Sequence, residues 1–320
     1  MTITTFQLYI LKRFAYSVVA LFIISIITFM ITQGLPGTAA DIRLGVHATD
    51  TSIALLEEQL NLGDPVHIQY INWLTGFVTL DWGTSYIFGE EILPVVVNRL
   101  VRSLQLAIVA FVLLATLGVT FGVISAVYNE TWVDEVITKM AYIGVSIPSF
   151  VAGVILLFIF AGPNLQWFPS GGYVPLQEDP IGWVHRMVLP AITVSIIATA
   201  HTLRQTRQGM LEALRSEYIR TAHLKGLAKW TVIGKHGMRN GLLSTVTILA
   251  FSFGWLMGSL VVVEEVFNYP GLGILLVDSI KRRDIPVIQA IIMIIAATYL
   301  LSNLVADIVY TYLDPRIDYE

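Results

Sequence analysis

The chain has 320 residues, of which 55% are hydrophobic and 13% are charged, with a formal net charge of -4 at pH 7. Soluble domains carry about 25% charged residues, so this composition and a mean hydropathy of +0.72 indicate a polytopic membrane protein, and the small net charge gives no support to nucleic-acid binding. The absence of cysteine excludes disulfides, thiolate metal sites and cysteine nucleophiles.

Six stretches are apolar enough to cross a bilayer, which takes about 20 residues. They lack Asp, Glu, Lys and Arg, and in chain order they are Phe14–Ile31, the stretch between Arg102 and Glu130, Met140 to about Phe160 with Pro148 inside it, Met187–Leu203, the stretch between Arg239 and Glu264, and the stretch between Asp284 and Asp307, which continues towards Tyr312. The first lacks a small-residue cleavage site and is too long for a signal peptide. The sequence thus predicts an all-α integral membrane protein with six transmembrane helices.

The connecting segments differ in length and character. The segment after the first span holds TSIALLEEQLNLG, whose leucines predict a short amphipathic helix in a cap outside the membrane. The Gly- and Pro-rich stretch Gly162–Pro180 reads as an outer turn-rich loop. Glu264 and Glu265 are interpreted as a helix end at the water boundary, with a gating role as the alternative, and Tyr269–Leu272 has the Pro-Gly order of a type II turn.

Lys and Arg are enriched in the segments that lie inside when the N terminus is inside. These segments contain Lys12, Arg13, Lys139, the basic stretch from Arg204 to Arg239, and Arg316. The basic run at 281–283 opposes this bias and is partly offset by Asp284. The distribution predicts a multi-pass protein of the cell membrane with both termini in the cytoplasm.

One inner segment, SEYIRTAHLKGLAKW, is polar between two apolar spans. An apolar stripe of helical spacing is predicted there, and its members are Leu211, Leu214, Tyr218 and Ala222. Ser216 is a candidate N-cap, Glu217 suits the positive N-terminal end, and Gly226 can supply a left-handed stop after Lys225. The pattern predicts a surface docking helix of about ten residues, although any inner loop is expected to be basic.

The same segment carries a resemblance to a known family. EYIRTAHLKGL followed by HGMRNGLL resembles the EAA-type loop of membrane permeases from ATP-binding-cassette (ABC) importers of the dipeptide, oligopeptide and nickel class. The likeness covers nearly the whole chain, and its other motifs, in order, are FMITQGLPGTA, LNLGDPVHIQYINWL, LDWGTSY, SIPSF, EEVFNYPGLG, RRDIPVIQA and LDPRI. Each motif is weak alone, but their order and spacing together are specific.

The resemblance implies a MetI-like type-1 ABC importer permease fold. It divides the chain into an N-terminal helix with an extracytoplasmic cap (1–100), a five-helix transmembrane domain (101–313) and a cytoplasmic tail (314–320). The implied partners are a second homologous permease, two cytoplasmic ABC ATPase subunits and an extracytoplasmic solute-binding protein, all assembled in the lipid bilayer.

The resemblance also assigns a role to the polar segment, at about 216–226. It implies a coupling helix that docks in a groove of the ATPase, carried by Glu217, Tyr218, Arg220, Thr221, Ala222, Lys225 and Gly226. Arg220, Thr221 and Ala222 stand where the motif name calls for Glu-Ala-Ala, the form of the peptide class. Ser244 replaces a common proline, so the fifth span is free to begin earlier. Peptides are the expected cargo, with nickel and sugars as open alternatives.

Catalytic and ion-coupled readings find little support. The chain has no P-loop, since GKH at 234–236 lacks the upstream glycine and the hydroxyl. Its histidines have no zinc-binding spacing; His201 is read as a packing residue or as part of a pathway. No cofactor, metal or enzymatic activity is expected, and ATP hydrolysis is assigned to partners. An ion-coupled secondary transporter is the main alternative, with Asp307 as its one candidate coupling group.

Overall fold

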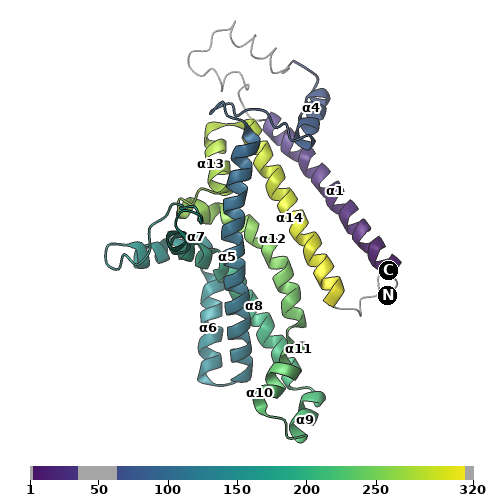
Figure 1. The fold of residues 1–320 in the computed structure, drawn as a ribbon, viewed down its shortest axis with the longest axis vertical. Coiled ribbons are helices and arrows are strands. Elements are labelled where there is room, and N and C mark those ends of the chain that lie inside the picture. Colours follow the sequence, from purple (N-terminus) through teal and green to yellow (C-terminus); the bar gives the residue numbers. More distant parts are fainter. Residues whose placement is uncertain (1–2, 35–62, 314–320) are drawn as a thin grey trace.

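The computed structural model describes residues 3–34 and 63–313, and within them the protein is all-α, as predicted (Figure 1). In chain order the helices are α1 (Ile3–Gln33), α4 (Val66–Val78), α5 (Ile92–Val127), α6 (Trp132–Ser146), α7 (Ser149–Leu156), the π-helix η2 (Leu157–Ala161), α8 (Pro180–Leu214), α9 (Glu217–Leu224), α10 (Lys229–Thr231), the π-helix η3 (Val232–Gly237), α11 (Met238–Gly241), α12 (Leu243–Val266), α13 (Leu272–Arg282) and α14 (Ile285–Leu313). The amphipathic helix predicted around Leu55–Leu62 and the 314–320 tail lie outside the described residues.

Within the described residues, five helices are long and apolar enough to cross a membrane: α1, α5, α8, α12 and α14. The predicted third span is not a continuous helix, because α6 and the α7–η2 segment meet at an angle of 108°. The break falls at Ile147 and Pro148, both of which have extended backbone angles. Proline has no N–H for the helix ladder and disfavours a helical residue before it, which accounts for the bend. The pair makes a sixth span only if it is counted as one broken crossing.

The fourth span is longer than predicted. The sequence limit at Leu203 was set by the basic residues that follow, but α8 runs on to Leu214. Its 35 residues correspond to roughly 50 Å at 1.5 Å per residue, more than a bilayer core requires. In Figure 1, α8 descends with α5 and α6 towards α9, while α13 lies at the opposite end of the bundle. These are called the α9 end and the α13 end below.

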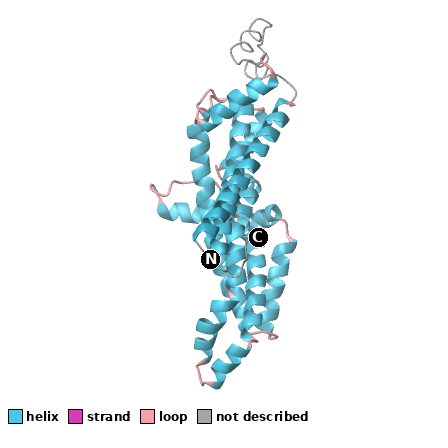
Figure 2. Ribbon diagram, turned by 90° about the vertical axis from the view of Figure 1, so that its right-hand side faces the viewer, coloured by secondary structure: helices cyan, strands magenta, loops and turns pink. Residues whose placement is uncertain are grey.

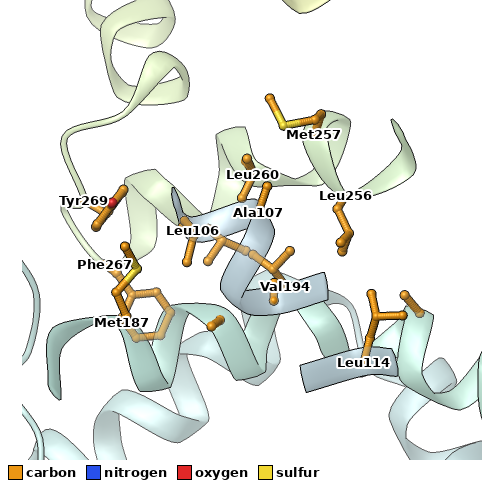
Figure 3. Packing of buried hydrophobic residues seen from close by; sticks show 14 of the residues in the cluster. Leu106, Ala107, Leu114, Met187, Val194, Leu256, Met257, Leu260, Phe267 and Tyr269 are labelled. Atoms are coloured by element: carbon orange, nitrogen blue, oxygen red, sulfur yellow. The ribbon is translucent and has the colours of Figure 1, made fainter. Parts of the chain in front are cut away.

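The core of the bundle is built where α5, α8 and α12 meet. Buried side chains from these helices and from the segment after α12 form one cluster, which Figure 3 shows at close range. Farther towards the α9 end, a Cβ added to Gly122 of α5 would lie 2.5 Å from the Cβ of Thr206 on α8. Only glycine permits this close approach, so the backbone of α5 packs directly against side chains of α8 at Gly122 and, one turn away, at Gly118.

Helix α1 is the most peripheral of the long helices, and it packs against α14 and α4 (Figure 1). Two polar contacts fix it to α14: the amide of Gln289 donates to Thr32 Oγ1 at 2.7 Å, and Arg13 pairs with Asp307 at 3.0 Å. Its remaining exposed side chains between residues 18 and 31 are apolar. The side view in Figure 2 shows the elongated outline of the whole helical arrangement.

The turn predicted at Tyr269–Leu272 has a different geometry. A type II turn needs a positive φ at its third residue, but Gly271 has φ -99°. Its N–H instead donates to the carbonyl of Tyr269 at 2.7 Å, which closes a tighter, three-residue turn around Pro270. The Leu272 N–H is then free for a side-chain acceptor on another helix, as described below.

Candidate functional site

The polar helix α9 begins after a break in the chain at the end of α8. Arg215 ends α8, and Ser216 has extended backbone angles as the N-cap of α9. The Ser216 hydroxyl donates back to the Ala213 carbonyl at 2.5 Å and does not cap α9. This break makes the predicted continuous stripe from Leu211 to Ala222 wrong, because helical spacing does not carry across a change of direction.

Helix α9 has one buried face. Ile219 and Ala222 are buried against Val232 of η3, and the three form a small separate core. Tyr218, which the sequence placed on the buried stripe, is 41% exposed, so that assignment is wrong. The α9 core holds the helix against η3, and the other side chains of the helix project away from the bundle.

The remaining predicted site residues share this outward face. They are Glu217, Arg220, Thr221, Lys225 and Gly226, all exposed. Glu217 lies in the first turn, as predicted, and its carboxylate is 3.9 Å from the guanidinium of Arg220. An exposed pair of this kind contributes at most about 1 kcal/mol, so both charges remain available to another molecule.

Gly226 ends the helix in the left-handed conformation, with φ +74°. Its N–H donates to the His223 carbonyl at 2.9 Å, and the Leu227 N–H donates to the Ala222 carbonyl at 3.3 Å. This pair of bonds is the Schellman motif, which satisfies the last carbonyls of a helix and turns the chain sharply. The predicted left-handed stop is therefore present.

Two exposed apolar side chains next to this helix were not singled out from the sequence. Leu224, in the last turn of α9, is 81% exposed, and Trp230 is 68% exposed. Exposed Trp and Leu beside charged groups are typical of the centre of a protein interface. In the sequence, this surface could have been recognised from Trp230, a single tryptophan in a polar loop.

The α9 end is joined to the bundle through a close crossing of α8 and α11. A Cβ added to Gly209 would lie 2.3 Å from the carbonyl oxygen of Gly241, so the two backbones touch. Beside this crossing, Met210 and Ile233 pack on Ala126 of α5. Helix α9 thereby follows α8 in the chain and packs on η3, which in turn contacts α11.

An ion pair near the α9 end, which no pattern in the sequence predicted, links α6 to α8. Arg207 donates to both carboxylate oxygens of Asp134, from Nε at 2.8 Å and from an NH2 group at 2.7 Å. The Ser125 hydroxyl also donates to Asp134, at 2.5 Å. The same NH2 group of Arg207 donates a second bond to the side-chain oxygen of Asn129, at 2.9 Å. The bidentate geometry gives both strength and a fixed orientation.

A second polar cluster, at the α13 end, corrects the interpretation of Glu264. Its side chain is not at the water boundary but fully buried, whereas Glu265 is exposed and pairs with Lys281 at 3.1 Å. Ser103 of α5 and the Gly273 N–H of α13 both donate to Glu264, each at 2.6 Å. The carboxylate thus sits at the positive N-terminal end of α13, where negative charge is favoured.

Two neighbours complete this cluster. The guanidinium of Arg99 donates to the Pro270 carbonyl at 3.0 Å, and the hydroxyl of Tyr269 donates to the Arg102 carbonyl at 3.0 Å. Burial raises the pKa of Tyr269, so the hydroxyl stays protonated and keeps this bond over the whole physiological pH range. Two residues of the segment between α12 and α13, Tyr269 and Pro270, are therefore bonded to α5.

His201 and Asp307 are also placed by the structure. His201 is exposed on α8, in a pocket of about 500 Å³ that α6, α8 and α12 line. Asp307 is paired with Arg13 at 3.0 Å. Among the described residues, no group of three His, Asp or Glu side chains has the arrangement of a metal site.

Comparison with known proteins gives consistent matches over almost the whole chain. The model of the family "Binding-protein-dependent transport system inner membrane component" matches residues 118–319, and the model of its N-terminal region matches residues 6–107. A putative peptide transport system permease protein of Brucella abortus is 35% identical over 311 residues, which cover 97% of this chain and 99% of that protein.

Two further similarities were found. The glutathione transport system permease protein GsiC of Salmonella typhimurium is 35% identical over 312 residues, covering 98% of this chain and 99% of that protein. A solved amino acid ABC transporter aligns with a TM-score of 0.47 at 18% identity, covering 70% of this chain and 94% of that one. The family matches and the full-length relatives confirm the resemblance seen in the sequence motifs: the chain belongs to the family of inner membrane components of binding-protein-dependent transport systems, the permease subunits of ABC importers.

Proposed function

We propose that this permease forms half of a translocation pathway for peptides, with a second, similar permease as the other half. An extracytoplasmic solute-binding protein delivers the solute, and two cytoplasmic ATPase subunits supply the energy. The observation that carries the proposal is the match over 97–98% of this chain to relatives whose names say peptide or glutathione transport. Peptides are the chemical class that these names share.

Helix α9 is the proposed contact with the ATPase. Three features support this role: the exposed charges of Glu217 and Arg220, the exposed Leu224 beside them, and the sharp exit at Gly226. A short helix fixed on one face by its own core transmits a push without bending, because packed interiors deform little. In this arrangement the ATPase moves α9, and α8, η3 and α11 carry the movement into the bundle.

The energy source is tested by uptake in vesicles. The chain purified alone is expected to hydrolyse no ATP, whereas vesicles holding the assembled complex take up peptide when ATP is supplied. Uptake is expected to persist when an uncoupler collapses the proton gradient at constant ATP. Immediate loss of uptake under those conditions would favour the ion-coupled alternative instead.

The docking role is tested by co-purification of the ATPase with single variants. Arg220→Glu replaces attraction by repulsion and is expected to lower ATPase recovery by about tenfold or more, since charge reversal at an interface costs several kcal/mol. Lys139→Glu is the control, because Lys139 is exposed on α6, away from α9, and pairs with Glu135. Equal recovery with both variants would show that α9 is a basic loop without a docking role.

The proposed orientation places α9 in the cytoplasm and the loop 162–179 outside. The chain has no cysteine, so single cysteines report position directly. With an impermeant maleimide on intact cells, Glu178→Cys is expected to react, and His223→Cys is expected to react only after permeabilisation. The reverse pattern would invert the proposed topology.

A further inference from the structure

The exposed face of α8 near the α9 end is entirely polar. From His201 onwards the exposed residues recur at intervals of three or four, so they form one stripe along the helix. Its members are His201, Arg204, Gln208, Glu212 and Arg215. A span that faced lipid here would have apolar side chains at these positions, because charged groups in hydrocarbon are costly.

The depth of this stripe is set by the neighbouring helix α6. Ala141 of α6 packs on Ala200 and Leu203 of α8, and Asp134 of α6 bonds to Arg207, so these parts of the two helices lie side by side. At that level α6 exposes Met140, at 65%, on its other surface.

Among the exposed positions of α6, one row is apolar. Val136 and Ile143 join Met140 in this row at helical spacing, and the exposed pair Glu135–Lys139 lies beside it towards the α9 end. Beyond that pair, at Met140 and Ile143, one side of the molecule is suited to lipid at a depth where the other side presents His201. A polar face at this depth needs water or protein in front of it.

The stripe lines the pocket of about 500 Å³ described above. Tyr142 of α6 and Ile248 of α12 form its side walls. Arg207 also lines the pocket, but its charge is satisfied by Asp134. Arg204 lies over the ring of Tyr142, 5.7 Å from its centroid, and has no carboxylate partner among the described residues. The pocket therefore holds a guanidinium without an ion-pair partner beside a neutral aromatic wall, while Glu212, a carboxylate that also lines the pocket, accepts a bond from Gln208 at 3.2 Å.

We propose that this face of α8 lines the water-filled, inner part of the translocation pathway, and that Arg204 binds the carboxylate of the solute as it leaves. The proposal rests on the proposed function, because it takes the solute to be a peptide with a free carboxylate. Guanidinium groups bind carboxylates through charge-assisted hydrogen bonds. A single guanidinium near the exit attracts the carboxylate end of a peptide. Because it is only one group, it does not bind the peptide too tightly for release.

Water access is tested with single cysteines in inside-out vesicles that contain the whole transporter. A charged methanethiosulfonate reacts only with thiols that water can ionise, so His201→Cys and Gln208→Cys are expected to react about tenfold faster than Met140→Cys. Met140 is the matched control, since it lies at the same depth on the lipid-facing side. Equal rates at His201→Cys and Met140→Cys would overturn the proposal.

The role of Arg204 is tested by charge selectivity. Adding Arg204→Gln to His201→Cys is expected to slow the anionic sulfonatoethyl reagent and speed the cationic trimethylammonium reagent, changing the ratio of rates by about tenfold. Lys139→Gln, an exposed charge on α6 outside the pocket, should leave that ratio unchanged. An unchanged ratio with Arg204→Gln would remove the proposed anion site.

Protection by solute separates a peptide site from a lipid site. Alanyl-alanine is expected to slow labelling of His201→Cys, and alanyl-alanine amide, which lacks the carboxylate, is expected to do so less. Protection by phosphatidylglycerol but not by the dipeptide would instead assign the pocket to a lipid headgroup and overturn the proposal. ATP-driven uptake measured in the same vesicles tests the proposed function separately, because labelling does not require transport.

Discussion

Ser103 and Glu264 lie on different helices, and the hydroxyl of Ser103 donates to the Glu264 carboxylate at 2.6 Å. The same hydroxyl oxygen accepts the Leu272 N–H at 2.8 Å. One serine thus connects α5 both to the carboxylate on α12 and to the first residue of α13. The start of α13 is fixed by buried bonds, even though α13 itself lies at the end of the bundle.

Glu264→Gln is expected to loosen α13. The amide offers one acceptor oxygen in place of two, so Ser103 and Gly273 can no longer each donate to a separate carboxylate oxygen, and the loss of these charge-assisted bonds costs about 1–3 kcal/mol. Hydrogen exchange of the α13 amides is expected to accelerate accordingly. Glu265→Gln is the control, because its exposed pair with Lys281 is worth at most about 1 kcal/mol. Equal exchange in the two variants would mean that Glu264 does not anchor α13.

Asp134→Asn is expected to destabilise the bundle near the α9 end. Removing one charge of a largely buried pair leaves Arg207 without its partner and costs about 3 kcal/mol. Thermal unfolding in detergent measures the loss. The neighbouring carboxylate gives a matched control, since Glu135→Gln breaks only an exposed pair with Lys139 and is expected to cost less than about 0.5 kcal/mol. Similar midpoints for both variants would contradict the assignment.

Gly226→Ala is expected to cost about 1–2 kcal/mol, because a residue with a Cβ is strained in the left-handed region. Gly234→Ala is the comparison: neither glycine has an atom within 4 Å of an added Cβ, but only Gly226 has a positive φ. Gly234→Ala is therefore expected to leave stability unchanged or to raise it. Unfolding midpoints that fall equally would show that backbone conformation is not the cause.

Gly209→Ala is expected to separate α8 from α11. The added methyl group would meet the Gly241 carbonyl, which is backbone and cannot rotate away, and overpacking of this kind costs about 1–3 kcal/mol. Gly258→Ala is the control, because an added Cβ there has nothing within 4 Å. The yield of folded protein by size-exclusion chromatography distinguishes them, and equal yields would argue against a tight crossing.

The sequence predicted the long apolar helices and the stop at Gly226, because hydrophobic length and glycine conformation are local properties. It did not predict where α8 ends. Arg204 and Arg207 looked like the start of an inner loop, but Arg207 is neutralised by Asp134 and Arg204 lines a pocket. A charged residue indicates the membrane boundary only where the fold provides neither an ion-pair partner nor a polar pocket for it.

The same limitation explains the errors at Glu264 and Pro148. The burial of Glu264 depends on Ser103 and Gly273, which lie on two other helices, so no window of sequence around Glu264 contains the reason. Pro148 was recognised, but a proline permits both a kinked span and a sharp bend. The choice between them depends on packing of α7 against α8 and α12.

The pairing of α1 with α14 has a consequence for the order of assembly. A chain made from its N terminus places α1 in the membrane before α14 exists. During this interval the Thr32 hydroxyl still has a hydrogen-bond partner, because it donates to the Thr28 carbonyl within α1 at 2.9 Å. The exposed apolar side chains of α1 suit lipid. Once α14 is made, its residues Gln289 and Asp307 supply the polar contacts that position α1. Docking of α1 on the bundle is thus a late event in biogenesis, and a chain that ends before α14 would leave α1 inserted, with α4 beside it, but without a fixed place on the bundle.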